Sequence, residues 1–240
     1  MTRPLLILET GQPVDSMRRH RGFPHWIRVA AGLRADEAES VDVQGGEPLP
    51  PHTRYAGIIV TGSGAMVTDR ADWSEASAQW LRDAAHARVP VFGICYGHQL
   101  LAHALGGEVG PHPDGREMGT VELQLHAPAS NDALFAGLPG RFAVQTTHLQ
   151  TVLRAPEGAT VLARSAHDPC QAMRWGDRVW GVQFHPEFSV THMRGYIDAR
   201  RVALQREGHC PRRMLGDVGA TPHARRVLRR FALKAQSLSR

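Results

Sequence analysis

Val91-Phe92-Gly93-Ile94-Cys95-Tyr96-Gly97-His98-Gln99 is the stretch that decides the fold of this 240-residue chain. A short apolar run ends in a Gly-x-Cys-x-Gly turn, and a helical pattern begins directly after it. A sharp turn from strand to helix brings the residues two before and two after its centre together, so glycine at 93 and 97 is a steric requirement. The pattern predicts a nucleophile elbow that presents Cys95 above the edge of a sheet.

The elbow also favours the thiolate of Cys95, because the dipole of the following helix and nearby N–H groups stabilise negative charge. Outside such a turn a lone cysteine is more often a small buried hydrophobe, and Cys170 and Cys210 are interpreted that way. Three cysteines without metal spacing indicate a reducing compartment and exclude a disulfide framework and a zinc site. We therefore expect Cys95 to be a nucleophile that needs no metal.

Apolar runs and helical patterns alternate on both sides of the elbow. The first part of the chain has expected strands at 5–9, 40–43, 57–61 and 90–94, and expected helices at 23–33, 73–87 and 97–105. This alternation predicts an α/β fold with a central, mostly parallel sheet flanked by helices. Shorter alternating runs follow and should continue the sheet as strands and hairpins, at 121–125, 142–145, 160–163, 171–174 and 179–184.

The second informative stretch is Gly181-Val182-Gln183-Phe184-His185-Pro186-Glu187-Phe188. On an extended chain the side chains of His185 and Glu187 lie on the same side, and Pro186 favours extension. A carboxylate beside an imidazole fixes its tautomer and stabilises the imidazolium. We expect His185 to act as the base and Glu187 to orient it. His98 and His103, five apart on a helix, do not share a face and form no metal pair.

A third element is the turn Gly62-Ser63-Gly64, which follows an apolar strand. It is either a plain connecting loop or a source of free backbone N–H groups. Together with the N–H of Tyr96, such groups would suit the anionic oxygen of a tetrahedral intermediate. Gln99 lies one helical turn after Cys95 and points its carboxamide to the same side.

These residues resemble the class I, triad-type glutamine amidotransferases, whose flavodoxin-like glutaminase domain carries a Gly-x-Cys-x-Gly-x-Gln elbow and a late His-Pro-Glu. The resemblance covers roughly residues 5–189 and is greatest to free-standing members similar to the glutaminase domain of GMP synthase and to gamma-glutamyl peptidases. It implies Cys95 as nucleophile, His185 as base and then acid, Glu187 as its orienter and Gln99 as a glutamine contact. Tyr96 would lend its N–H to the oxyanion hole.

The chain departs from that family at three places. The segment Gln145-Thr146-Thr147-His148 stands where the family has a substrate-side loop, so Thr147 and His148 are expected to line the pocket, although Leu149 replaces the usual glycine. The oxyanion turn reads Gly62-Ser63-Gly64 where members often read Gly-Gly-Pro or Asn-Gly-Pro, and Ser63 is the expected donor. No nucleotide-binding signature or synthetase domain is visible, so the acceptor reaction is not encoded here.

The net charge of +5 is unevenly distributed. Residues 1–189 hold 16 basic and 20 acidic residues, whereas residues 190–240 hold 12 and 3. We expect a catalytic domain at 1–189 and a basic helical extension at 190–240, with helices at 189–207 and from Thr221 onward. The apolar stripe Val227, Leu228 and Phe231 should pack the last helix on the body. Its opposite face, which carries Arg225, Arg226, Arg229 and Arg230, should attract an acidic partner or a second copy of the chain.

The preferred hypothesis is hydrolysis of the γ-amide of L-glutamine through a Cys95 thioester, without a cofactor, to supply ammonia to a separate synthetase. A stand-alone hydrolase of γ-glutamyl compounds and a non-catalytic binding module are the alternatives. A fold in which the thiol pairs with an earlier carboxylate and His directly follows Cys is disfavoured by Tyr96. The acidic body disfavours nucleic acid, and no apolar run approaches the roughly 20 residues of a membrane span. Without a secretory signal, a cytoplasmic location is expected.

Overall fold

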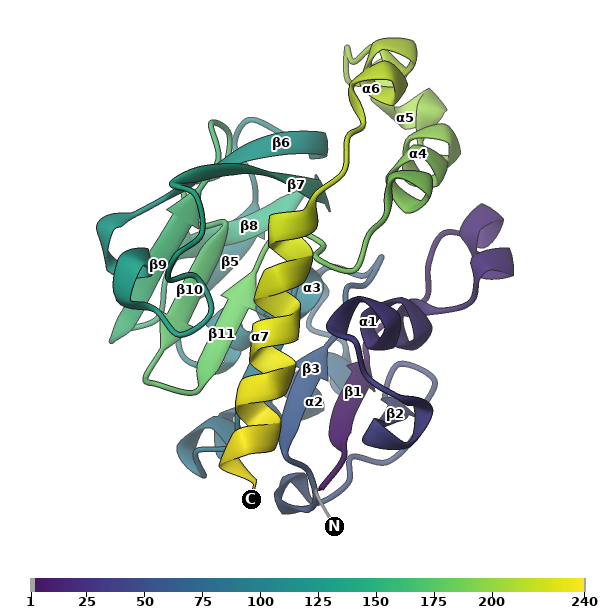
Figure 1. Cartoon of the computed structure of the whole chain (residues 1–240). Coiled ribbons are helices and arrows are strands. Elements are labelled where there is room, and N and C mark those ends of the chain that lie inside the picture. The colour runs from purple at the N-terminus through teal and green to yellow at the C-terminus, as the bar shows by residue number, and fades with distance from the viewer. Residues whose placement is uncertain (1–2, 240) are drawn as a thin grey trace.

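The structure is a computed structural model that describes residues 3–239. A nine-stranded sheet forms its centre, with helices packed on both faces (Figure 1). The strand order is β2-β1-β3-β4-β11-β10-β9-β6-β7, and a separate two-stranded sheet pairs β5 with β8. The expected α/β class is confirmed.

The main sheet is mixed and not mostly parallel as expected, because the strands that follow the elbow return in hairpins and pair antiparallel. The parallel strands are β2 (Ala38–Asp42), β1 (Leu5–Glu9), β3 (Gly57–Val60), β4 (Val91–Ile94) and β11 (Val179–Val182). The antiparallel part consists of β10 (Ala172–Trp175), β9 (Ala159–Arg164), β6 (Glu117–Leu125) and β7 (Arg141–His148). The hairpins expected after the elbow therefore extend the sheet, and β6 and β7 are longer than the expected 121–125 and 142–145.

The parallel strands are buried on both faces, which explains their nearly continuous apolar sequence. Successive side chains of a strand point to opposite faces of the sheet and pack against different helices. Ile59 packs with α1 (Phe23–Ala31) and α7 (Pro222–Leu238), whereas Ile58 and Val60 pack with α2 (Asp72–His86) and α3 (Tyr96–Ala104). Figure 1 shows α7 lying along one face of the sheet beside α1.

The sequence did not predict the small sheet of β5 (Glu108–Pro111) and β8 (Gln150–Arg154). Two of the four residues of β5 are Gly110 and Pro111, types that are depleted in strands, so its local pattern indicates a loop. Tertiary pairing overrides that local preference. The pairing places the residues that follow β7 next to α3 and the elbow.

The single helix expected at 189–207 is wrong. The structure has α4 (Val190–Ala199) and α5 (Arg201–Arg206), which are separated at Arg200, where φ is −101° and ψ is 11°. The expected interruption after residue 207 contains a further helix, α6 (Pro211–Asp217), because proline is well suited to a first helical position. Figure 1 shows α4 to α6 beyond the edge at which the parallel strands end.

Helix α7 begins after Thr221 as expected, and Val227, Leu228 and Phe231 are fully buried against the body. The sequence predicts that the four arginines of α7 face solvent, but two of them form hydrogen bonds with the body. Arg229 Nε donates to the carbonyl of Ala30 at 3.2 Å, and Arg230 donates to two carbonyls of the body, those of Leu134 and Ala136. Two of the four arginines thus fasten the helix to the body. The division of the chain at Ser189 stays a prediction.

Candidate active site

The strand, turn and helix expected around Cys95 are all present. Cys95 follows β4 directly and has φ of +51° and ψ of −101°, a left-handed conformation that costs a non-glycine residue about 1–3 kcal/mol. A Cβ on Gly93 would overlap the carbonyl oxygen of Gly97, and a Cβ on Gly97 would lie 2.6 Å from that of Val60. The two glycines therefore permit the close approach that the turn requires.

The segment after β11 brings His185 and Glu187 to the same edge, because β11 pairs in parallel with β4. His185 Nδ1 donates to Glu187 Oε1 at 2.7 Å, and both side chains are buried. A Cβ on Gly62 would lie 2.9 Å from His185 Cε1 and 3.8 Å from Cys95 Cβ, so the thiol and the imidazole flank one glycine. His185 Nε2 has no hydrogen-bond partner among residues 3–239.

Burial and nearby charges have opposite effects on the pKa of His185. Burial lowers its pKa, but the charges of Glu187 and Cys95 outweigh burial and raise the pKa to about 10. His192, on the next helix, shows burial without strong compensation, and its pKa falls to about 4. The raised pKa favours the protonated form of the His185 ring beside Cys95.

We expect an NMR titration to find the His185 ring protonated well above its ordinary value of 6.5, with the midpoint near 10. Glu187→Gln should move the midpoint down, because the carboxylate charge is removed. Since the folded-state pKa is raised, the charge contributes stability that is fully present below pH 6.5 and is lost as the pH rises toward 10. A ring that titrates at or below 6.5 would contradict the charged pair.

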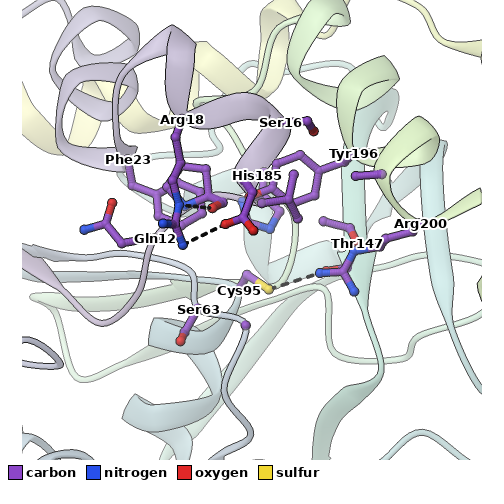
Figure 2. Close-up of a pocket in the computed structure, with 15 residues that line it drawn as sticks. Gln12, Ser16, Arg18, Phe23, Ser63, Cys95, Thr147, His185, Tyr196 and Arg200 are labelled. Atoms are coloured by element: carbon purple, nitrogen blue, oxygen red, sulfur yellow. Dashed lines mark hydrogen bonds and ion pairs between the residues drawn. The ribbon is translucent and has the colours of Figure 1, made fainter.

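A cavity of about 590 Å³ opens over Cys95 and His185 (Figure 2). Its walls include a short 3-10 helix at Asp15–His20 and the end of α4, with Tyr196 and Arg200. Its volume lies in the range of small-molecule sites. Cys95 is only 6% exposed, so the cavity gives access to a thiol that is more buried than the sequence indicates.

A second, narrower cavity of about 40 Å³ also borders Cys95, and Tyr96, Gln99 and Leu149 are among the residues that line it. Ser63 and Gly64 line both cavities. In the described part of the chain, the backbone N–H groups of Ser63 and Tyr96 donate no hydrogen bond. They are thus available to an oxygen bound near Cys95, the arrangement expected for an oxyanion hole.

Gln99 is held differently from the expectation. Its Nε2 donates to the carbonyl of Gln150 at 2.7 Å and to Gln183 Oε1 at 2.9 Å, and Gln183 Nε2 donates to Cys95 Sγ at 3.5 Å. Gln99 therefore reaches the nucleophile through a buried chain of amides. Sequence reasoning missed Gln183, although its place two residues before His185 puts it on the same side of an extended chain.

Thr147 and His148 both line the narrow cavity, as expected. The carbonyl oxygen of Thr147 lies 3.8 Å from Cys95 Sγ. Both ring nitrogens of His148 are already engaged, because Nδ1 faces the carbonyl of Gln150 at 3.0 Å and Nε2 faces Glu117 Oε2 at 2.9 Å. The His148 side chain therefore stabilises the turn between β7 and β8.

Two absences hold for residues 3–239. No cluster of three or more His, Cys, Asp or Glu side chains is arranged to hold a metal ion. None of the described helices has the length and apolar character needed to cross a membrane.

The family model for class-I glutamine amidotransferase matches residues 33–202, which include the elbow and the His-Pro-Glu segment. The chain belongs to this family. Class-I glutamine amidotransferases are a family of glutamine-hydrolysing enzymes. The chain is 45% identical over 155 residues to GMP synthase [glutamine-hydrolyzing] of Aeropyrum pernix, covering 64% of this chain and 28% of that protein. It spans about a quarter of the length of the GMP synthases it matches.

Solved structures share the fold of this amidotransferase over nearly its whole length. A glutamine amidotransferase from Thermotoga maritima superposes with a TM-score of 0.76 at 21% identity, covering 98% of this chain and 99% of that one. A glutamine amidotransferase from Methylobacillus flagellatus gives a TM-score of 0.74 at 24% identity, covering 99% and 94%. The helical segment after residue 202, which lies beyond the family match, is thus part of a fold seen in other proteins.

Proposed function

We propose that this chain is a glutaminase that hydrolyses the γ-amide of glutamine through a thioester on Cys95. The observation that carries the proposal is the position of His185 beside Cys95, whose φ is positive, with Glu187 hydrogen-bonded to the far nitrogen of the His185 ring. Family membership supports glutamine as the substrate class.

In the proposed reaction the Cys95 thiolate attacks the δ-carbon of the substrate, and the N–H groups of Ser63 and Tyr96 stabilise the oxyanion. The imidazolium of His185 protonates the leaving nitrogen, the carbon–nitrogen bond breaks and ammonia departs. His185, now neutral, takes a proton from water, which attacks the thioester and releases glutamate. The departing thiolate and the recharged imidazolium restore the starting pair.

The chain would deliver its ammonia to a separate acceptor enzyme. Its matches to GMP synthases cover about a quarter of the length of those proteins. One observation favours a second candidate, a stand-alone γ-glutamyl hydrolase. The 590 Å³ cavity over Cys95 offers room for a leaving group larger than ammonia.

Steady-state hydrolysis by the purified chain separates the two candidates. A glutaminase should release ammonia from L-glutamine with kcat/KM at least equal to that for γ-glutamyl dipeptides. A higher kcat/KM for the dipeptides would select the hydrolase. Absence of turnover of either substrate, with and without an added synthetase, would refute both.

A glutamine-like diazo-ketone should form one adduct, at Cys95. Cys170 should stay unmodified, because burial and then the charge of Asp168 raise its pKa to about 12. Cys210 is exposed but lines none of the cavities around Cys95, so Cys210→Ser should label like the wild type. Intact-mass analysis would measure the adduct, and labelling that persists in Cys95→Ala would overturn the assignment of the nucleophile.

A further inference from the structure

Arg200 stands at the break between α4 and α5, and its side chain lines both cavities around Cys95. In Figure 2 the Arg200 guanidinium lies beside Cys95. Its Nε is buried and has no hydrogen-bond partner, and among residues 3–239 no carboxylate forms an ion pair with it. The catalytic cavity therefore contains a cation whose hydrogen-bonding capacity is unused.

The other arginines near these cavities are neutralised. Arg18 pairs with Asp15 at 2.9 Å, and Arg116 holds Glu207 through two bonds of 2.8 and 3.0 Å. Burial and the charge of Arg116 lower the pKa of Arg200, but a guanidinium remains charged at neutral pH. Glu207 and the Tyr196 ring, whose centroid lies 5.9 Å from the guanidinium carbon, attract Arg200 without accepting a hydrogen bond from it. An anion that enters the cavity and accepts hydrogen bonds from Arg200 would offset the cost of burying this charge.

We propose that Arg200 binds the α-carboxylate of the glutamyl unit and thereby selects γ-amides that carry a free carboxylate. This inference rests on the proposed function, since it names the group that holds the substrate at Cys95. A guanidinium offers two parallel N–H donors to a carboxylate, which gives orientation as well as attraction. The carboxylate would sit beside Leu149 and Gln150 in the narrow cavity, with the amide end at the thiol.

A rival role for Arg200 is to stabilise the Cys95 thiolate directly. His185 already supplies a cation to the thiol, and Gln183 supplies a hydrogen bond. The two roles predict different rates for the reaction of Cys95 with neutral and with anionic reagents. Loss of an anion site slows only anionic reagents, whereas loss of thiolate stabilisation slows neutral and anionic reagents alike.

Alkylation of Cys95 in a Cys210→Ser background tests the proposal without requiring turnover. We expect Arg200→Gln to lower the rate ratio of iodoacetate to iodoacetamide about tenfold or more, and Arg200→Lys to restore part of it. Arg194→Gln, which removes an exposed arginine of the same helix, should leave the ratio unchanged. An unchanged ratio in Arg200→Gln, or equal slowing with both reagents, would overturn the proposal.

Kinetics provide the second readout. In Arg200→Gln the KM for L-glutamine should rise about tenfold or more while kcat changes little. 4-Aminobutanamide, which lacks the carboxylate, should react equally slowly with both proteins. If the wild type hydrolyses no glutamine but keeps its preference for iodoacetate, the proposed function fails and the anion site stands. If it hydrolyses glutamine and Arg200→Gln leaves KM unchanged, the anion site fails alone.

Discussion

His185→Ala is expected to reduce turnover of glutamine by roughly 10⁴-fold or more, whereas Glu187→Gln should leave measurable activity. In the proposed reaction the imidazole transfers protons at both chemical steps, so its loss leaves no group to protonate the leaving nitrogen or to take a proton from the attacking water. Glu187 touches only the far nitrogen of the ring, at 2.7 Å, and makes no bond to the substrate. Initial rates of ammonia release at saturating glutamine would measure the ranking.

Two controls accompany this comparison. Circular dichroism must show that each variant is folded, since both residues are buried. His103→Ala removes a histidine that lies outside both cavities around Cys95 and should keep full turnover. If Glu187→Gln is as inactive as His185→Ala, or if neither variant loses activity, the assigned roles are wrong.

Phe231→Ala should lower the free energy of unfolding by about 3–5 kcal/mol, a large share of the stability of an ordinary domain. Phe231 is fully buried, and its ring centroid lies 5.2 Å from that of Phe92 and 6.3 Å from that of Trp180. Both partners belong to the strands that precede Cys95 and His185, β4 and β11. Denaturation in guanidinium chloride would measure the loss.

Leu233→Ala is the matched control, because Leu233 lies on the same helix but is 67% exposed. It should change stability by less than about 0.5 kcal/mol. Equal effects of the two substitutions would show that α7 does not belong to the cooperative unit of the sheet. Two separate transitions in the wild type would support the division at Ser189, and a single transition would argue against it.

The elements that could be predicted from sequence are those with local signals. The Gly-x-Cys-x-Gly turn requires close backbone contacts, and the spacing of His185 and Glu187 places both on one side of an extended chain. The sequence held a weaker indication that Arg200 has a functional role. Its spacing continues the buried helix face of Met193, Tyr196 and Ile197, where a charged residue is unusual. The break between α4 and α5 could not be predicted, because no glycine or proline stands at Arg200 or next to it.

Other features depend on contacts between distant segments. β5 forms only because β8 pairs with it, and local composition could not indicate that partner. The engagement of Gln99 with Gln150 and Gln183 likewise joins three segments that are remote in sequence. Spacing within one element shows which side a residue faces but not which neighbour meets it there.

The pairing of β11 with β4 also has a consequence for the timing of synthesis. Cys95 precedes His185 by 90 residues, which a ribosome adds in roughly 5–20 s. During that interval the nascent chain has no His185 beside the thiol, and β4 has β3 on one side but no strand on the other. In the proposed mechanism His185 reaches the thiol only when β11 enters the sheet, so an unfinished chain would carry Cys95 without the histidine that the reaction requires.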